Sequence, residues 1–320
     1  MPAPPTLSCA PHPATRAGRW HDALQRFLAS PWAGPLLAMT GAVAFSGKAI
    51  IVKLAYRHGV DAITLIMLRM AVALPFFLLM VWWTGRGRAA LPWRDKLVAA
   101  ALGFSGYYLS STLDFLGLQY ITASLERLIL YLTPAVVLLL SWAVYGRRAS
   151  RAQWAAMALG YGGLLLVFGH ELTLDGPRVA LGSALVVAST LSYAGYLLYS
   201  GEVVRRIGSL RLTGWASSVA CGLCLLQFAL TRPLAGLADL APPVAWLSLL
   251  NGTACTVLPV LLVMMAIERI GSARTAQYGM VGPITTIALG VMILGEPFTA
   301  WVAAGTLCVL GSVALLARTR

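Results

Sequence analysis

Five charged residues lie inside stretches of the sequence that are otherwise apolar. They are Lys48, Arg69, Asp114, Glu126 and Arg127. The last two are neighbours in "ASLERLILYLTP", residues 123 to 134. A charge at the centre of a membrane-spanning helix costs about 2.5–3.5 kcal/mol on insertion scales, so such side chains usually face protein or water and belong to solute or ion pathways. If these stretches cross a membrane, the five residues are candidates for binding a charged solute or carrying a proton.

Helical geometry predicts that these five charges form one layer. Asp114 precedes a short connection and Arg127 follows it, so both should lie at the same depth and pair directly, with Arg69 and Lys48 close to that level. Arg127 would pair with Asp114 in the resting state. It would present its positive charge to an anionic or zwitterionic substrate that enters the cavity. Two interpretations stay open for the layer: a salt-bridged clamp between helices, or a site for substrate or protons.

The face of the helix that carries Arg127 also predicts which residues meet a cavity. Arg127, Tyr131 and Pro134 are spaced i, i+4 and i+7, so they share one face, whereas the adjacent Glu126 should point toward the segments 62–83 or 97–118. Glu126 would support the layer or carry a proton.

Other polar stripes at helical spacing are candidate cavity walls. They comprise Tyr107, Ser111 and Asp114; Ser189, Tyr193, Tyr196 and Ser200; and Asn251, Cys255 and Pro259. Interhelical packing is the competing interpretation, since polar groups also join helices in lipid. Pro134, Pro283 and Pro259 each remove a helical hydrogen bond and are candidate kinks or hinges.

The elements that position these residues follow from composition. Of 320 residues, 59% are hydrophobic and only 11% are charged, against about 25% charged in soluble domains. This indicates a membrane protein whose first partner is the lipid bilayer. The formal charge of +13 does not indicate a nucleic-acid partner here, because the basic residues lie mostly in short loops, where positive charge sets the orientation of a membrane protein.

Breaks at Pro, Gly and charged residues predict an all-α membrane protein with ten transmembrane helices. The expected spans are 32–52, 62–83, 97–118, 122–145, 152–169, 179–200, 213–231, 243–266, 275–294 and 299–317, after a disordered or amphipathic cytoplasmic leader at 1–31. Seventeen Lys and Arg residues then fall on the side of the N-terminus and four on the other. We therefore expect a multi-pass protein of a bacterial inner membrane, with both termini in the cytoplasm.

The chain also repeats itself. "YLTPAVVLLLSWAVYG" (131 to 146) and "MVGPITTIALGVMILG" (280 to 295) each place a glycine 12 residues after a proline, at a constant offset of 149. Each half, 32–169 and 179–317, then contains five helices, and an odd number inserts the second half upside down. Two inverted five-helix repeats are typical of secondary transporters, whose substrate site lies near the midplane between the halves.

Two longer segments carry a resemblance to a known family. "GLQYITASLERLILYLTPAVVLLLSWAVYG" and "AIERIGSARTAQYGMVGPITTIALGVMILGEPFTAWVAAGTLCVLGSVALL" resemble the EamA-type members of the drug/metabolite transporter superfamily, although the first half has "YGRRAS" where the second has the "LGEP" turn. The resemblance implies a ten-helix inverted-repeat bundle with a central cavity. Known activities of the superfamily are the export or uptake of amino acids, nucleotide-linked compounds and other small metabolites.

These observations predict a secondary transporter rather than an enzyme. We expect an exporter of a small polar metabolite, such as an amino acid or a related compound, with protons as the candidate coupling ion. No phosphate-cradling G-x-x-x-x-G-K-[ST] loop is present, and the "CGLC" of 221 to 224 has no second pair or histidine nearby, so we expect no cofactor and no metal. The alternatives are a non-transporting receptor or scaffold, and an intramembrane serine hydrolase using "GFSG" at 103 to 106, whose Ser105 lacks an intramembrane histidine.

Overall fold

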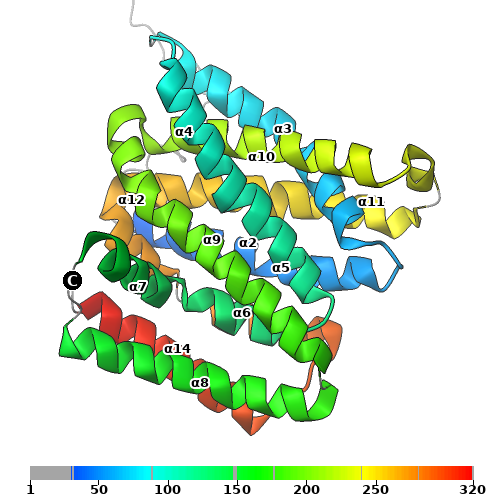
Figure 1. Ribbon diagram of the computed structural model, residues 1–320, viewed down its shortest axis with the longest axis vertical. Helices are drawn as coiled ribbons and strands as arrows, with labels where there is room; N and C mark the ends of the chain where they lie inside the picture. The colour runs from blue at the N-terminus through cyan, green and yellow to red at the C-terminus, as the bar shows by residue number, and fades with distance from the viewer. Residues whose placement is uncertain are drawn as a thin grey trace, which may run out of the picture.

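The computed structural model describes residues 30, 32–87, 89–146, 150–175, 177–238, 240–279 and 281–318, and these residues are helical with no strands (Figure 1). The predicted leader lies, apart from Ser30, outside the described residues. The first half contains α2 (Ala33–Tyr56), α3 (Ala62–Gly85), α4 (Trp93–Gly103), the π-helix η1 (Phe104–Leu109), α5 (Ser110–Leu118), α6 (Ala123–Tyr131), α7 (Thr133–Tyr145) and α8 (Arg151–Asp175). The all-α prediction is confirmed for this part of the chain.

The second half is built from similar elements. They are α9 (Pro177–Ile207), α10 (Ser209–Thr231), the 3₁₀-helix η2 (Leu234–Leu237), α11 (Pro242–Gly252), the π-helix η3 (Thr253–Val257), α12 (Leu258–Tyr278), α13 (Val281–Leu289), the π-helix η4 (Gly290–Leu294) and α14 (Ala300–Arg318). Figure 1 shows α2 beside α12, α3 beside α10 and α8 beside α14, so each of these contacts joins the two halves.

Seven helical segments of the described chain are long and apolar enough to cross a membrane, and shorter apolar helices cover Val281–Leu294 and Ala300–Ser312. Their outer faces are apolar as well: Leu230 and Leu307 are more than 70% exposed. A water-soluble protein rarely exposes such continuous apolar surface, whereas lipid favours it. The chain is therefore a multi-pass membrane protein.

One predicted boundary is wrong. The sequence suggested a loop between the spans 243–266 and 275–294, but α12 continues as a helix to Tyr278 and the next helix begins at Val281. The new helix α13 begins at Val281, two residues before Pro283, just as α6 ends at Tyr131, three residues before Pro134. A proline lacks the N–H of an interior helix residue but fits the first turn, so each helix restarts at its proline.

Pro259 stands in the first turn of α12, directly after η3. Its missing N–H removes the hydrogen bond to the carbonyl of Cys255, four residues earlier. Within η3 the hydroxyl of Thr256 donates to the carbonyl of Asn251, five residues before it, at 2.7 Å. Single π turns of this kind are frequent at functional sites. A hinge role for the three prolines stays a prediction.

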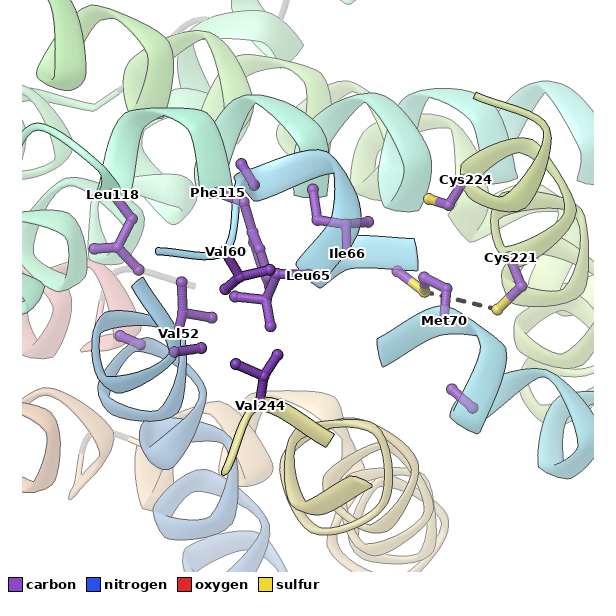
Figure 2. Packing of buried hydrophobic residues seen from close by; sticks show 14 of the residues in the cluster. Val52, Val60, Leu65, Ile66, Met70, Phe115, Leu118, Cys221, Cys224 and Val244 are labelled. Atoms are coloured by element: carbon purple, nitrogen blue, oxygen red, sulfur yellow. Dashed lines mark hydrogen bonds between the residues drawn. The ribbon is translucent and has the colours of Figure 1, made fainter. Parts of the chain in front are cut away.

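The largest apolar core lies between α2, α3, α5, α10 and α11. Figure 2 shows Phe115 and Leu65 at its centre, with Val244 below them and Cys221 beside Met70. The Cys221 thiol lies 3.6 Å from the sulfur of Met70, an ordinary core contact. This core surrounds the charged residues of α2, α3 and α5.

Small residues allow α8 and α14 to approach closely. A Cβ added at Gly163 would lie 2.9 Å from the carbonyl oxygen of Gly305, and one added at Gly305 would lie 2.7 Å from that of Gly163. Close backbone approach through small residues is a common way of joining helices in membranes.

Gly163→Ala should therefore destabilise the protein by about 1–3 kcal/mol, because the added methyl group meets backbone that cannot move aside easily. The adjacent Gly162 has open space around its Cα. Gly162→Ala should be neutral or stabilising by up to about 1 kcal/mol, since alanine favours a helix. Thermal unfolding of the two variants in detergent measures the difference; equal melting temperatures would contradict the packing described for α8 and α14.

Candidate functional site

Lys48 is the centre of the charged layer. Its Nζ lies 2.5 Å from Oδ2 of Asp114 on α5 and 3.1 Å from Oε1 of Glu126 on α6, the second contact being an ion pair without hydrogen-bond geometry. All five charged residues of the layer are between 0% and 6% exposed. One ammonium group therefore bridges two carboxylates and ties α2 to α5 and α6.

The direct pair of Asp114 with Arg127 that the sequence predicted is not formed, because Asp114 pairs with Lys48. Arg127 instead donates from Nη2 to the carbonyl of Phe45 on α2, at 3.4 Å, and lies 5.4 Å from the centre of the Phe45 ring. Its Nε is 4.0 Å from Oε2 of Glu126. The carboxylate of Glu126 faces Lys48 on α2, and through Lys48 it lies near Asp114 of the predicted segment 97–118. Sequence spacing predicts how far along a helix a residue lies, whereas the rotation of the helix about its own axis depends on packing.

A residue that the sequence analysis missed positions the helix with Glu126 and Arg127. The carboxylate of Glu296, in the "LGEP" turn, accepts hydrogen bonds from the backbone N–H of Ala123 at 2.7 Å and of Ser124 at 3.2 Å, and from the Ser124 hydroxyl at 2.7 Å. Thr122 accepts from the N–H of Leu125 at 3.1 Å. A carboxylate is favourable there because the first N–H groups of a helix lack partners and carry partial positive charge. The turn of the second half thus caps α6 of the first.

Glu296→Ala should lower the free energy of unfolding by about 1–2 kcal/mol, as the loss of a helix cap does. Glu296→Gln keeps one acceptor oxygen and should lose less. Thermal unfolding of both variants against wild type checks the order. An alanine variant as stable as wild type would show that α6 does not depend on this cap.

The interrupted helices meet at their breaks. The hydroxyl of Tyr131, the last residue of α6, donates to the carbonyl of Gly279, between α12 and α13, at 2.5 Å. The hydroxyl of Ser46 on α2 donates to the carbonyl of Gly282 at 2.9 Å. The carbonyl of Gly279 also accepts a hydrogen bond from the backbone N–H of Gly282, at 2.9 Å. The breaks are therefore held together across the two halves.

Arg69 forms a second polar group in the same interior. Its Nε donates to Oγ1 of Thr256 in η3 at 2.8 Å, and its guanidinium lies 5.2 Å from the centre of the Phe115 ring. Asn251, at the end of α11, is fully buried. The sequence placed Arg69 in the charged layer and Asn251 in a separate polar stripe, and the structure brings α3 and η3 together at Arg69.

The predicted tyrosines form a third group. The hydroxyls of Tyr107 and Tyr196 lie 3.2 Å apart, and the Tyr193 ring stacks on that of Tyr196 with centres 5.7 Å apart. Tyr107 is seven residues before Asp114, roughly 10 Å along the helix axis. Ser111, between them, is half-buried. The stripes therefore extend from the charged layer along η1 and α9.

The pockets described for the molecule lie elsewhere. One of about 360 Å³ is bordered by Asp61, Arg232 and Phe228, and a neighbouring one by Tyr56, Gln119 and Tyr120; neither includes a predicted site residue. Asp61 caps α3 and lies 3.1 Å from Arg232. Burial alone would raise the pKa of Asp61, but hydrogen bonds from Thr64 and Arg232 outweigh it and lower the pKa. The candidate site consequently rests on the buried charges, which are closed to solvent in this conformation.

The serine-hydrolase interpretation gains no support. The hydroxyl of Ser105 is directed to the carbonyl of Leu102 on its own helix, at 3.5 Å, which is a common arrangement for serine in a membrane helix.

Apolar helices around a buried layer of opposite charges define a class, the multi-pass membrane transporters. Comparison with known proteins is more specific: the EamA-like transporter family matches the chain twice, over residues 32–169 and 180–318. The chain belongs to the EamA-like transporter family.

Individual relatives agree with this assignment. The chain is 31% identical to an uncharacterized transporter of Bacillus subtilis, YcbK, over 82% of this chain and 86% of the relative. A second uncharacterized transporter of that organism, YetK, is 23% identical over 88% and 86%. A crystal structure with 17% identity has a similar fold, with a TM-score of 0.62 over 91% of this chain and 99% of the other.

Proposed function

We propose that this protein is a secondary transporter that exports a small polar metabolite, such as an amino acid or a related compound, across the cytoplasmic membrane of a bacterium. The observation that carries the proposal is the contact of Lys48 with both Asp114 and Glu126 inside an apolar bundle. Removing three charges from water is expensive, and replacing such groups with apolar residues is often neutral or stabilising. Their presence is therefore better explained by a function in the pathway of a solute than by stability.

The cluster suggests how protons would drive the cycle. Protonation of Glu126 or Asp114 removes one of the two charges that hold Lys48, so α2 is released from α6 or from α5. The amine of a solute would need the same carboxylates in their ionised form, so a proton and the solute would compete for the cluster. A proton and a solute would in this way favour different arrangements of the same helices, which is the requirement for coupling them.

The proposed architecture has ten membrane crossings in two inverted five-helix repeats, with both termini in the cytoplasm. Support comes from the two family matches and from the similar breaks before Pro134 and Pro283. The contact of Tyr131 with Gly279 would lie near the axis that relates the repeats.

Reporter fusions test this topology. Reporters after residues 90 and 149 should read as cytoplasmic, and those after 175 and 236 as exterior, because the excess of Lys and Arg lies in the loops expected in the cytoplasm. A cytoplasmic signal after residue 175 would rule out the five-plus-five inverted arrangement, since that connection closes the first repeat.

A flux screen tests the function itself. Purified protein in proteoliposomes with an imposed proton gradient would be offered a mixture of amino acids, sugars and nucleotide derivatives, with internal solutes measured by mass spectrometry. The proposal predicts gradient-dependent movement of at least one solute. A receptor or scaffold, the remaining alternative, would bind a solute and raise its own melting temperature without moving it.

A further inference from the structure

The buried charges of the layer do not cancel. Three cations, Lys48, Arg69 and Arg127, face two carboxylates, so the layer has a net charge of +1 when all five groups are ionised. Lys48 contacts both carboxylates, and Arg127 is 4.0 Å from Glu126. Among the described residues, no carboxylate lies within 4.0 Å of Arg69. The uncompensated charge is therefore concentrated at Arg69.

The polar atoms near Arg69 are also incompletely bonded. Nη1 of Arg69 and both amide atoms of Asn251 are buried without a hydrogen-bond partner. The backbones are close here, because a Cβ added at Gly252 would lie 2.8 Å from the carbonyl of Arg69. A buried polar group without a partner is costly, and each one in a native structure calls for an explanation, such as a role in catalysis or binding, or a bound water or ion. Here unsatisfied donors accompany an unsatisfied positive charge.

We infer that Arg69, Thr256 and Asn251 form a subsite for the carboxylate of the transported solute, an inference that rests on the proposed function. A carboxylate would accept hydrogen bonds from Nη1 of Arg69 and from the amide of Asn251, and would cancel the excess charge. Thr256 holds Nε, and the Phe115 ring lies against the guanidinium, so the donors are fixed in advance. A planar guanidinium matches the two oxygens of a carboxylate.

The neighbouring carboxylate extends the inference to a zwitterion. Asp114 precedes Phe115, whose ring centre lies 5.2 Å from the guanidinium of Arg69, and its Oδ1 is a buried acceptor without a partner. An ammonium group on the same solute would donate to this oxygen. The structure thus assigns the solute a carboxylate at Arg69 and, beside it, an amine at Asp114. This is the pattern of an α-amino acid, with Arg69 rather than Arg127 as the anion-binding residue.

Stability and binding of the purified protein test the subsite together. Arg69→Met keeps the length of the side chain but removes the charge, so the ligand-free variant should melt at or above the wild-type temperature. Glycine, L-alanine, L-leucine and L-glutamate, each compared with its α-carboxamide, serve as probes. At least one acid should raise the melting temperature of the wild type while its amide does not. For the same rise, Arg69→Met should need an at least about tenfold higher concentration of that acid.

Arg69→Lys serves as the matched variant: it keeps the charge but loses the two-pronged contact, and should bind with intermediate strength. A marked fall in the melting temperature of ligand-free Arg69→Met would overturn the inference and make Arg69 a structural residue. So would equal shifts with acids and amides, or no shift with any acid. Failure of the proposed function looks different, because acids would stabilise the wild type through Arg69 while no solute crossed the proteoliposome membrane.

Discussion

Lys48→Met should remove most of the folded protein. The substitution leaves the carboxylates of Asp114 and Glu126, both within 3.1 Å of Lys48 Nζ in the wild type, buried in an apolar bundle without their shared cation. Breaking a buried ion pair on one side costs about 3–5 kcal/mol, a large fraction of the stability of an average protein. The measurement is the yield of monodisperse protein after detergent extraction, followed by size-exclusion chromatography.

The triple variant Lys48→Met, Asp114→Asn, Glu126→Gln is the decisive control. With no charge left on these three residues, its yield should recover substantially but not fully, because Arg127 loses Glu126, 4.0 Å from its Nε in the wild type. Arg86→Met, an exposed residue at the end of α3, should have no effect. A wild-type yield for Lys48→Met alone would contradict the cluster, because it would mean that neither carboxylate depends on Lys48.

Glu126→Gln should abolish the pH dependence of transport while leaving the protein folded. Asp114 is the nearer partner of Lys48, at 2.5 Å against 3.1 Å, so the Lys48–Asp114 pair survives this change and folded yield should fall little. Glutamine has nearly the same volume but no titratable proton. If Glu126 carries the coupling proton, gradient-driven flux should fall at least about a hundredfold, as expected when the group that couples two ligands is removed.

Asp114→Asn separates the two carboxylates. It should lower folded yield more than Glu126→Gln, since it removes the closer contact. Flux is measured at several pH values in proteoliposomes for both variants. An unchanged pH profile for Glu126→Gln would exclude Glu126 as the proton carrier and leave Asp114 as the candidate.

The depth of the charged layer could be predicted from the sequence, but its pairing could not. Counting residues from the short connection between α5 and α6 predicted that Asp114 and Arg127 lie at one depth, and the structure links the two residues through Lys48 and Glu126. Which residue pairs with Asp114 depends on how α2, α5 and α6 are rotated against one another, and rotation arises from packing across the whole bundle. Lys48 was therefore recognised as a member of the layer but not as its centre.

The helix boundaries, too, could be predicted from the sequence only in part. Apolar runs bounded by Pro, Gly and charges predicted most helices of the described chain. The segment "RIGSARTAQ" at 269 to 277 contains glycine and two arginines and favoured a loop, yet α12 continues through it. Local sequence cannot reveal the neighbours that keep such a segment helical. Glu296 could be predicted only as part of a turn, because nothing near it in the sequence indicates that it caps a helix whose first residue lies 173 positions earlier.

We propose that the buried cluster of Lys48, Asp114 and Glu126 lies in the transport pathway. The most direct measurement is flux through proteoliposomes that contain the triple variant Lys48→Met, Asp114→Asn, Glu126→Gln, using the solute that the wild type moves and equal amounts of folded protein. The account predicts a folded variant whose flux equals that of empty liposomes. Wild-type flux from the folded triple variant would contradict it, because the cluster would then be only a clamp between helices.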